Sequence, residues 1–385
     1  MQSLCWVSGM GDDRRMSAPT SDLAPPTVAA PAPGGSLAAL RAGFRRVPGY
    51  LNAATTGLPS LATADALTAA LQTWQAGRMD AADFDTAVTR SRRAFAQLVG
   101  TDPAHVAVGS QASVSVGLVA AALPDGARVV TVHGDFTSVV FPFLVHADRG
   151  VQVRQVPLEG LSDAVAQGCD LVAFSLVQSA DGRIADAQAV RAAAATAGAL
   201  TLCDLTQAAG WLPVRADDWD LTVCSAYKWL SCPRGAAFST VGPHVADRLR
   251  PLHAGWYAGE TIWESTYGPG MTLAGDARRF DVSPAWFAWA GAAPAMELFA
   301  GTDITAVHRH DIALADGLLA RLGLPPRGSA VVALPDPDGR VRAALEAAGC
   351  AVAGRAGKVR IAFHVWNDDG DVDRAAVALR GFVTA

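Results

Sequence analysis

The chain has 385 residues, 51% of them hydrophobic, and a formal net charge of −5 at pH 7. A chain of this length can bury a core without disulfides or metals. Its charges are scattered and form no basic stripe, which argues against a nucleic-acid partner. Its apolar runs, such as residues 139–145, stay well short of the ~18 residues of a membrane span, so we expect a soluble protein without a membrane partner.

The cysteines and histidines indicate the compartment and argue against a metal. Six cysteines stand at positions 5, 169, 203, 224, 232 and 350, and no two of them form a C-x-x-C pair. Reduced thiols in a cytoplasmic protein fit this pattern best. His308 and His310 form the close histidine pair of the sequence, without a third ligand near them. We therefore expect no metal site.

Residues 1–36 contain Ala-Pro-Pro and Ala-Pro-Ala-Pro-Gly-Gly and show no hydrophobic period. This composition predicts a disordered leader, or sequence upstream of a later true start such as Met16. The leader has no apolar stretch of the signal-peptide kind. From residue 61 to about residue 98 the apolar spacing is helical.

The middle of the chain alternates between short apolar runs and helical patterns. This alternation predicts a mostly parallel sheet flanked by helices, and residues 61–284 form the expected large domain. Beyond residue 284 longer helical patterns predominate, which predicts a smaller α+β domain over residues 285–385. The expected strands are 105–108, 129–132, 151–156, 170–176, 200–204, 221–225, 236–240, 330–334 and one around Arg360, and the expected helices are 114–123, 139–147, 187–197, 284–297, 305–322, 340–348 and 372–382.

The most informative motif joins two predicted strand ends. Asp204 leaves an apolar run, Gln207 follows three residues later, and Lys228 stands 24 residues after the acid. A lysine amine that forms a Schiff base, and a carboxylate that keeps a pyridine nitrogen protonated, are what pyridoxal 5′-phosphate (PLP) chemistry requires. We interpret Lys228 and Asp204 as these two catalytic residues. Taken singly, Asp204 would be read as an ordinary strand-end acid and Lys228 as an ordinary surface lysine, and it is the surrounding motifs that favour the catalytic interpretation.

Asp-x-x-Gln followed by Ser-x-x-Lys resembles the class V aminotransferase family of fold-type I PLP-dependent enzymes. The match favours its kynureninase, isopenicillin N epimerase and C–S lyase-like branch. The resemblance implies the PLP-dependent transferase fold of type I, with a seven-stranded, mostly parallel sheet in the large domain and a small α+β domain. It also implies that residues 37–60 join the small domain, and that Asn52 lies near the substrate.

The resemblance extends to the residues that would hold the cofactor. Ala112 and Ser113 would seat its phosphate on a helix N-terminus, although Ser-Gln-Ala-Ser is also an ordinary helix cap. Phe136 would stack on the pyridine ring, although a lone Phe after a strand is often core. Ser179 stands where Asn is common, near the phenolic oxygen. The cofactor-binding set is Ala112, Ser113, Phe136, Ser179, Asp204, Gln207, Ser225, Tyr227, Lys228 and Ser283.

Two further segments resemble the family near the C-terminal half of the chain. Arg360 begins Arg-Ile-Ala-Phe-His-Val-Trp-Asn, which is similar to the strand whose Arg grips the substrate α-carboxylate with two parallel hydrogen bonds. Residues 279–284 resemble the segment that reaches the phosphate of a neighbouring subunit. Here Ser283 replaces a Thr and one residue is missing. The resemblance thus implies a homodimer with shared sites.

The motifs leave the reaction open, because several PLP reactions share the Lys, the Asp and the Arg. Our default is an aminotransferase acting on an α-amino acid. The alternatives are a β-eliminating C–S lyase similar to the ergothioneine-pathway sulfoxide lyases, an amino-acid epimerase, or a non-catalytic PLP-binding regulatory protein. Cysteine desulfurases are disfavoured, because residues 345–360 are too short for a mobile loop and Cys350 reads as core. A group of aromatic residues predicts either a substrate pocket or interface packing: Trp256, Tyr257, Trp263, Tyr267, Trp286 and Trp289.

Overall fold

The structure is a computed structural model that describes residues 35–382. The predicted leader lies outside the described residues, except for its last two positions. None of the described helices is long and apolar enough to cross a membrane. Among residues 35–382, no group of three His, Cys, Asp or Glu side chains is placed to hold a metal ion.

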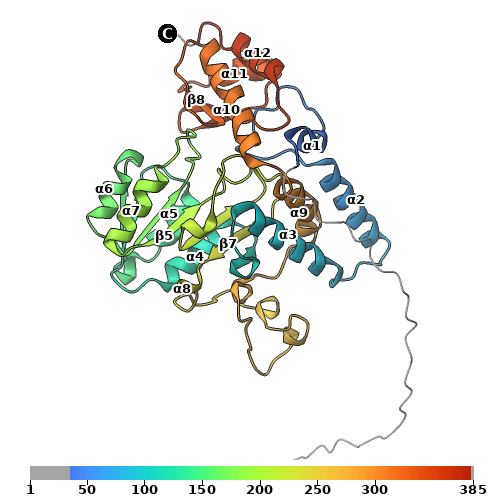
Figure 1. The fold of residues 1–385 in the computed structure, drawn as a ribbon, viewed down its shortest axis with the longest axis vertical. Helices are drawn as coiled ribbons and strands as arrows, with labels where there is room; N and C mark the ends of the chain where they lie inside the picture. The colour runs from blue at the N-terminus through green and yellow to red at the C-terminus, as the bar shows by residue number, and fades with distance from the viewer. Residues whose placement is uncertain (1–34, 383–385) are drawn as a thin grey trace, which may run out of the picture. The chain divides into compact units, whose positions relative to one another are not determined.

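Residues 106–241 build a seven-stranded sheet (Figure 1), and the predicted mostly parallel arrangement is confirmed. Its strand order is β1-β7-β6-β5-β4-β2-β3. All neighbours from β3 to β6 pair in parallel, whereas β7 is antiparallel to both β6 and β1. The strands are β1 (Val106–Gly109), β2 (Arg128–Val132), β3 (Gln152–Val156), β4 (Leu171–Ser175), β5 (Leu200–Asp204), β6 (Leu221–Ser225) and β7 (Ala237–Val241).

Both faces of this sheet are apolar and covered, as expected for parallel strands. Consecutive residues alternate between the faces, so Ala173 and Phe174 of β4 belong to hydrophobic clusters on opposite sides. One face carries α4 (Ala112–Ala122) and α5 (Thr137–Leu144). The other carries α3 (Asp83–Val99), α6 (Leu161–Ala166), α7 (Ala187–Ala197) and α9 (Trp286–Ala300).

The helical stretch expected over residues 61–98 is two helices, α2 (Leu61–Gln75) and α3. The first ends at Gln75 with Ala76 as its C-cap, and Gly77 follows with a φ of +67°. Helices often end where the chain enters this left-handed region, and glycine enters it easily because it has no Cβ to clash with the backbone. Both helices pack against α9, with the rings of Phe84 and Trp286 stacked 5.7 Å apart.

A second, three-stranded antiparallel sheet has the order β8-β10-β9. Its strands are β8 (Val331–Pro335), β9 (Ala353–Arg355) and β10 (Lys358–Ala362), and the helices around it are α10 (Ile304–Arg321), α11 (Arg340–Ala347) and α12 (Asp369–Ala378). Leu51 is buried in the core that these elements share. Its neighbour Asn52 bridges to Ala362, at the end of β10. The start of the described chain, which includes α1 (Leu37–Ala42), thus runs past the strand that carries Arg360.

The segment between β7 and α9 is mostly irregular. It contains the short helix α8 (Pro243–Ala246) and 3-10 turns at Trp256–Ala258, Glu264–Thr266 and Ala277–Phe280. Asp85 of α3 accepts hydrogen bonds from the Tyr257 hydroxyl at 3.0 Å and from the Trp263 indole at 2.8 Å. Tyr257 and Trp289 are buried, whereas Tyr267 is 88% exposed. These aromatic residues therefore do not form one uniform pocket wall.

Candidate active site

The predicted catalytic residues lie at the carboxyl edge of the parallel strands. Asp204 is the last residue of β5 and Ser225 the last of β6, and Lys228 follows three residues later. Ser175 ends the neighbouring strand β4, directly opposite Asp204 in the register. This edge is where open α/β sheets hold their ligands.

Lys228 is only 5% exposed. Its Nζ lies 5.1 Å from the centre of the Phe136 ring and 5.7 Å from that of Tyr227. Burial lowers the pKa of the Lys228 amine to about 8, with Asp204 opposing this shift and Arg360 adding to it. The amine is therefore neutral, and nucleophilic, over a pH range in which an exposed lysine is charged.

This low pKa predicts how fast PLP attaches to the apoenzyme. The sequence contains two lysines, and the other one, Lys358, is ion-paired with Asp181 at 3.0 Å. In a Lys358→Arg variant, the rate of borohydride-trapped attachment should rise with pH and level off above about pH 8. An exposed lysine with a pKa near 10.4 would continue to speed up. A rate that still climbs steeply between about pH 9 and 10 would contradict this assignment.

Asp204 is 3% exposed and accepts a hydrogen bond from the Thr206 amide at 2.8 Å. Burial raises the pKa of this carboxyl to about 6, against the effects of Thr206 and Lys228. A carboxylate in this environment gains from facing a cation, because its charge is otherwise poorly solvated. The protonated pyridine nitrogen of PLP is such a cation, so the site fits the cofactor on this side.

The first turn of α4 fits a phosphate. The helix begins after Gln111, whose side chain makes no capping hydrogen bond. The ordinary serine cap that the sequence allowed is therefore not formed. Ala112 is buried and its amide donates to the Ser225 hydroxyl at 3.1 Å, while Ser113 is half-buried. Uncapped amides and the helix dipole favour an anion at this position.

Phe136 is held beside Lys228 by a residue that the sequence did not reveal. Asp135 is 7% exposed and accepts hydrogen bonds from the Phe136 amide at 2.7 Å, from the Ser175 amide at 2.8 Å and from the Ser175 hydroxyl at 2.6 Å. It thereby fastens the Phe136 turn to the end of β4. Phe136 itself is 42% exposed, which leaves its ring accessible to a ligand. The sequence offered one indication of this role, because Asp135 directly precedes Phe136.

Gln207 connects several parts of the site. Its Nε2 donates to the Ala54 carbonyl at 3.0 Å and to the Ser179 hydroxyl at 3.2 Å. Its Oε1 accepts from the Trp229 indole at 2.7 Å. Ser179, predicted to lie near the phenolic oxygen, and Gln207, predicted to bind the cofactor, are thus brought together from the segments that follow two adjacent strands, β4 and β5.

Arg360 is 2% exposed and is not the solvated edge charge that an Arg at a strand start often is. Its guanidinium donates to the Thr55 hydroxyl at 2.8 Å, to the Ser179 hydroxyl at 3.2 Å and to the Ser179 carbonyl. Burial lowers the pKa of Arg360 to about 10. Within residues 35–382, its Nε and the Oδ1 of Asn52 find no hydrogen-bond partner although both are buried. Such buried polar atoms gain from a ligand that pairs with them.

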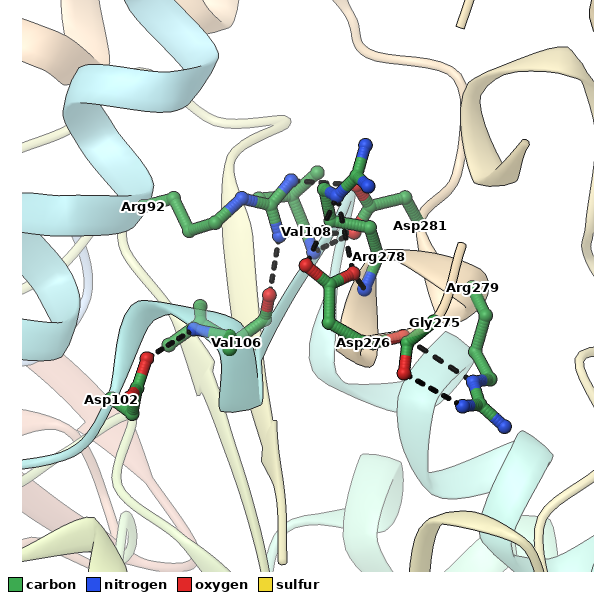
Figure 2. A network of polar contacts seen from close by, with 10 residues as sticks. Arg92, Asp102, Val106, Val108, Gly275, Asp276, Arg278, Arg279 and Asp281 are labelled. Atoms are coloured by element: carbon green, nitrogen blue, oxygen red, sulfur yellow. Dashed lines mark hydrogen bonds and ion pairs between the residues drawn. The ribbon is translucent and has the colours of Figure 1, made fainter. Parts of the chain in front are cut away.

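The segment that contains Ser283 is fixed to the edge strand β1. Asp281 pairs with Arg92 at 2.6 Å and accepts the Val108 amide at 2.8 Å (Figure 2). Burial raises the pKa of Asp281 to about 6, while Arg92 opposes the shift. The Val282 amide donates to the Val108 carbonyl at 3.1 Å, which places the segment beside the strand that leads into the α4 turn. Ser283 itself is exposed.

A hollow of about 840 Å³ lies outside this site. The residues that line the hollow include Glu159, Asp181, Arg183, Arg327 and Lys358. None of the predicted site residues lines it. The chemistry is therefore assigned to the buried residues at the strand edge rather than to the large open hollow.

Fold and site together define a fold-type I enzyme that uses PLP. A family model described as Aminotransferase class-V matches residues 50–338. The chain belongs to this family, as the motifs predicted.

Similar proteins in this family carry different names. An uncharacterized aminotransferase, YcbU, of Bacillus subtilis is 28% identical over 57% of this chain and 60% of its own length. A kynureninase of Salinispora tropica is 28% identical over 76% of both chains. An isopenicillin N epimerase of Streptomyces clavuligerus is 28% identical over 51% of both. The chain thus spans about three fifths of the Bacillus protein.

Solved structures show the same fold at lower identity. The cystine C-S lyase C-DES has a TM-score of 0.77 at 18% identity, covering 86% of this chain and 97% of the lyase. A cysteine desulfurase of Thermococcus onnurineus NA1 has a TM-score of 0.75 at 20% identity, covering 87% of this chain and 94% of the desulfurase. At this identity the similarity shows the fold and not the reaction.

Proposed function

We propose that this enzyme transforms an α-amino acid through a covalent link between PLP and Lys228, with transamination as the default reaction. The observation that carries the proposal is the burial of Lys228, Asp204 and Arg360 at one place. Hydrogen bonds connect the three segments. Arg360 and Gln207 both donate to the Ser179 hydroxyl, and Gln207, three residues after Asp204, accepts from the indole of Trp229, the residue after Lys228. A protein that only binds PLP has no need for all three.

When bound, PLP supplies an aldehyde for a lysine and a ring that withdraws electrons from the substrate Cα. Each residue then has a task that its surroundings support. The Lys228 amine, with a pKa lowered to about 8, populates both its charged and its neutral form near that pH and can accept and return a proton. Asp204 stabilises the positive ring nitrogen, and Phe136 covers one side of the site. Arg360, with Asn52 beside the same strand, binds the substrate carboxylate.

The products decide between the candidate reactions. Purified enzyme should be supplied with a panel of amino acids and an α-keto acid acceptor, and the products identified by mass spectrometry and chiral chromatography. An aminotransferase yields a keto acid and an aminated acceptor, whereas a C–S lyase yields pyruvate and ammonia. An epimerase yields the opposite enantiomer. A PLP-binding regulatory protein yields none of these, and that result would refute the proposed enzyme activity.

We place the enzyme in the kynureninase, epimerase and C–S lyase-like branch and outside the cysteine desulfurases. Cys350 supports this placement because it is 2% exposed and burial raises the pKa of its thiol. A desulfurase needs an accessible thiolate, and a buried thiol does not supply one. Cys169, Cys203, Cys224, Cys232 and Cys350 are free and buried, which fits a reducing compartment such as the cytoplasm.

Arg360→Lys tests the carboxylate contact. Lysine keeps the charge but loses the planar fork. We expect the KM for the amino acid to rise about ten- to a hundredfold, the effect of one lost charged hydrogen bond, with little change in kcat. Absorbance of the bound cofactor should stay unchanged. A matched amine without the carboxylate should be almost unaffected, and an equal loss for both substrates would instead indicate a structural role.

We also propose a homodimer in which Ser283 reaches the phosphate of the neighbouring subunit. The exposure of Ser283, beside a segment anchored by Asp281 and Arg92, supports this role. Ser283→Ala should weaken PLP affinity about five- to tenfold, the effect of one hydrogen bond, without changing the melting temperature of the apoprotein. Sedimentation should show a dimer, and a fully active monomeric holoenzyme would exclude the shared site.

A further inference from the structure

His364 lies next to the active site and has no role in the scheme above. Its side chain is completely buried. Its Nε2 lies 2.8 Å from the Trp229 carbonyl, and its Nδ1 lies 2.8 Å from Oδ2 of Asp311. A carbonyl only accepts, so Nε2 must donate to Trp229, and the carboxylate accepts in the same way from Nδ1. Asp311 and the Trp229 carbonyl thus hold the two ring nitrogens from opposite ends and fix the orientation of the ring.

Three aromatic rings surround the His364 imidazole. The His364 ring is stacked on Phe299 at 5.7 Å, and its centre lies 5.1 Å from the Trp229 ring and 4.8 Å from the Trp366 ring. The rings enclose the imidazole, and the hydrogen bonds of its two nitrogens set which way it faces.

The Trp229 carbonyl belongs to the residue directly after Lys228. The Trp229 indole donates to Gln207 at 2.7 Å, so Trp229 is held both at its carbonyl and at its side chain. The chain before Lys228 is held too, because the Tyr227 carbonyl accepts the Gly57 amide at 3.0 Å. Because the hydrogen bond from His364 is buried, removing its donor would leave the Trp229 carbonyl without this partner, which costs more than losing an exposed hydrogen bond.

His364 lies just after strand β10 and four residues after Arg360, which belongs to that strand. Its partner Asp311 lies on α10. The His364 side chain thus joins the small sheet and its covering helix to the main chain that carries Lys228. Two groups that must act on one substrate are connected through a single buried side chain.

We propose that His364 is a positioning residue that, oriented by Asp311, fixes the Trp229 carbonyl and with it the main chain of Lys228 relative to Arg360. This role rests on the proposed function of Lys228. It differs from plain core packing because it depends on the two hydrogen bonds of the ring rather than on its volume.

The test compares His364→Phe, which keeps a ring of similar size but cannot donate, with the matched control His310→Gln. His310 also contacts Asp311, at 2.9 Å, but does not reach Trp229. Amide hydrogen exchange of the apoenzyme should increase at least about tenfold in the peptide over residues 227–231 of the Phe variant, as expected for the removal of one buried hydrogen bond. Exchange in the β4 and β5 peptides should not change, and the control should match wild type throughout.

The holoenzyme provides a second measurement. His364→Phe should lower kcat at least about tenfold with a smaller change in KM, because the substitution displaces Lys228 and leaves the Arg360 guanidinium in place to bind the carboxylate. His364→Gln, whose amide can still donate to the Trp229 carbonyl, should recover part of both the exchange protection and the kcat. If the Phe variant does not fold, Asp311→Asn, which removes the carboxylate charge at constant size, should increase exchange in the same peptide by less than about tenfold, because Nε2 of His364 can still donate to Trp229.

Unchanged exchange over residues 227–231, or an equal increase throughout the core, would overturn the positioning role. Failure of the proposed function has a different signature. In that case borohydride would not attach PLP to Lys228 of the wild-type enzyme, whereas the exchange results would still report on His364.

Discussion

Lys228→Ala is expected to abolish covalent attachment of PLP and to reduce turnover by at least about a thousandfold, because the variant loses both the covalent link and the proton carrier. Lys228→Met should show the same loss at a volume closer to that of lysine. Burial lowers the pKa of Lys228 to about 8, so the charged amine opposes folding below that pH. The Met apoprotein should therefore be at least as stable as wild type at neutral pH. Loss of function without loss of stability would identify a functional role.

The low lysine content makes this experiment unusually clear. Because Lys358 is the other lysine of the sequence, a Lys358→Arg background leaves a single lysine. Borohydride reduction followed by peptide mass spectrometry should then place the label on the peptide that contains Lys228. Lys358 pairs with Asp181, and Arg can keep this pair. A label on the amino terminus, or on Lys358 in the wild-type protein, would contradict the assignment of Lys228.

Much of the fold follows from local pattern. Residues 187–197, 200–204 and 221–225 form helices and strands with the predicted limits, because apolar period and segment length agree there. The break after Gln75 was missed because the helical spacing continues across it. Only Gly77, with its positive φ, marked the end of the first helix.

The predicted site residues came from spacing along the chain and from resemblance to a family. The residues that support them could not be found in this way. Asp135 acts through Ser175, 40 residues away, and Thr55 contacts Arg360 across 305 residues. The pairing of His364 with Trp229 spans 135 residues. Such pairings depend on how strands and helices pack, and no local period encodes them.

Asp204→Asn should slow turnover at least about a hundredfold while the protein still attaches PLP to Lys228. The asparagine keeps the size of the side chain and can still accept the Thr206 amide through its oxygen. It loses the negative charge that pairs with the pyridine nitrogen. A charge-assisted hydrogen bond contributes about 1.5–3 kcal/mol, and its loss matters most when the ring draws electrons from the substrate.

Stability separates this role from a structural one. Burial raises the pKa of Asp204 to about 6 from 3.8, so the stability that this group contributes is fully present below about pH 3.8 and is lost as the pH rises through 6. At pH 7 the ionised carboxylate therefore opposes folding of the apoprotein, and Asp204→Asn should melt at the same temperature or higher. Asp135→Asn is the matched control, because that carboxylate is buried at the same edge but bonds to Ser175 and Phe136. It should reduce turnover no more than about tenfold, since it displaces Phe136 without touching the ring nitrogen. Near-normal turnover of Asp204→Asn, or a fall in apoprotein stability at pH 7 that parallels the loss of activity, would show that Asp204 does not serve the cofactor.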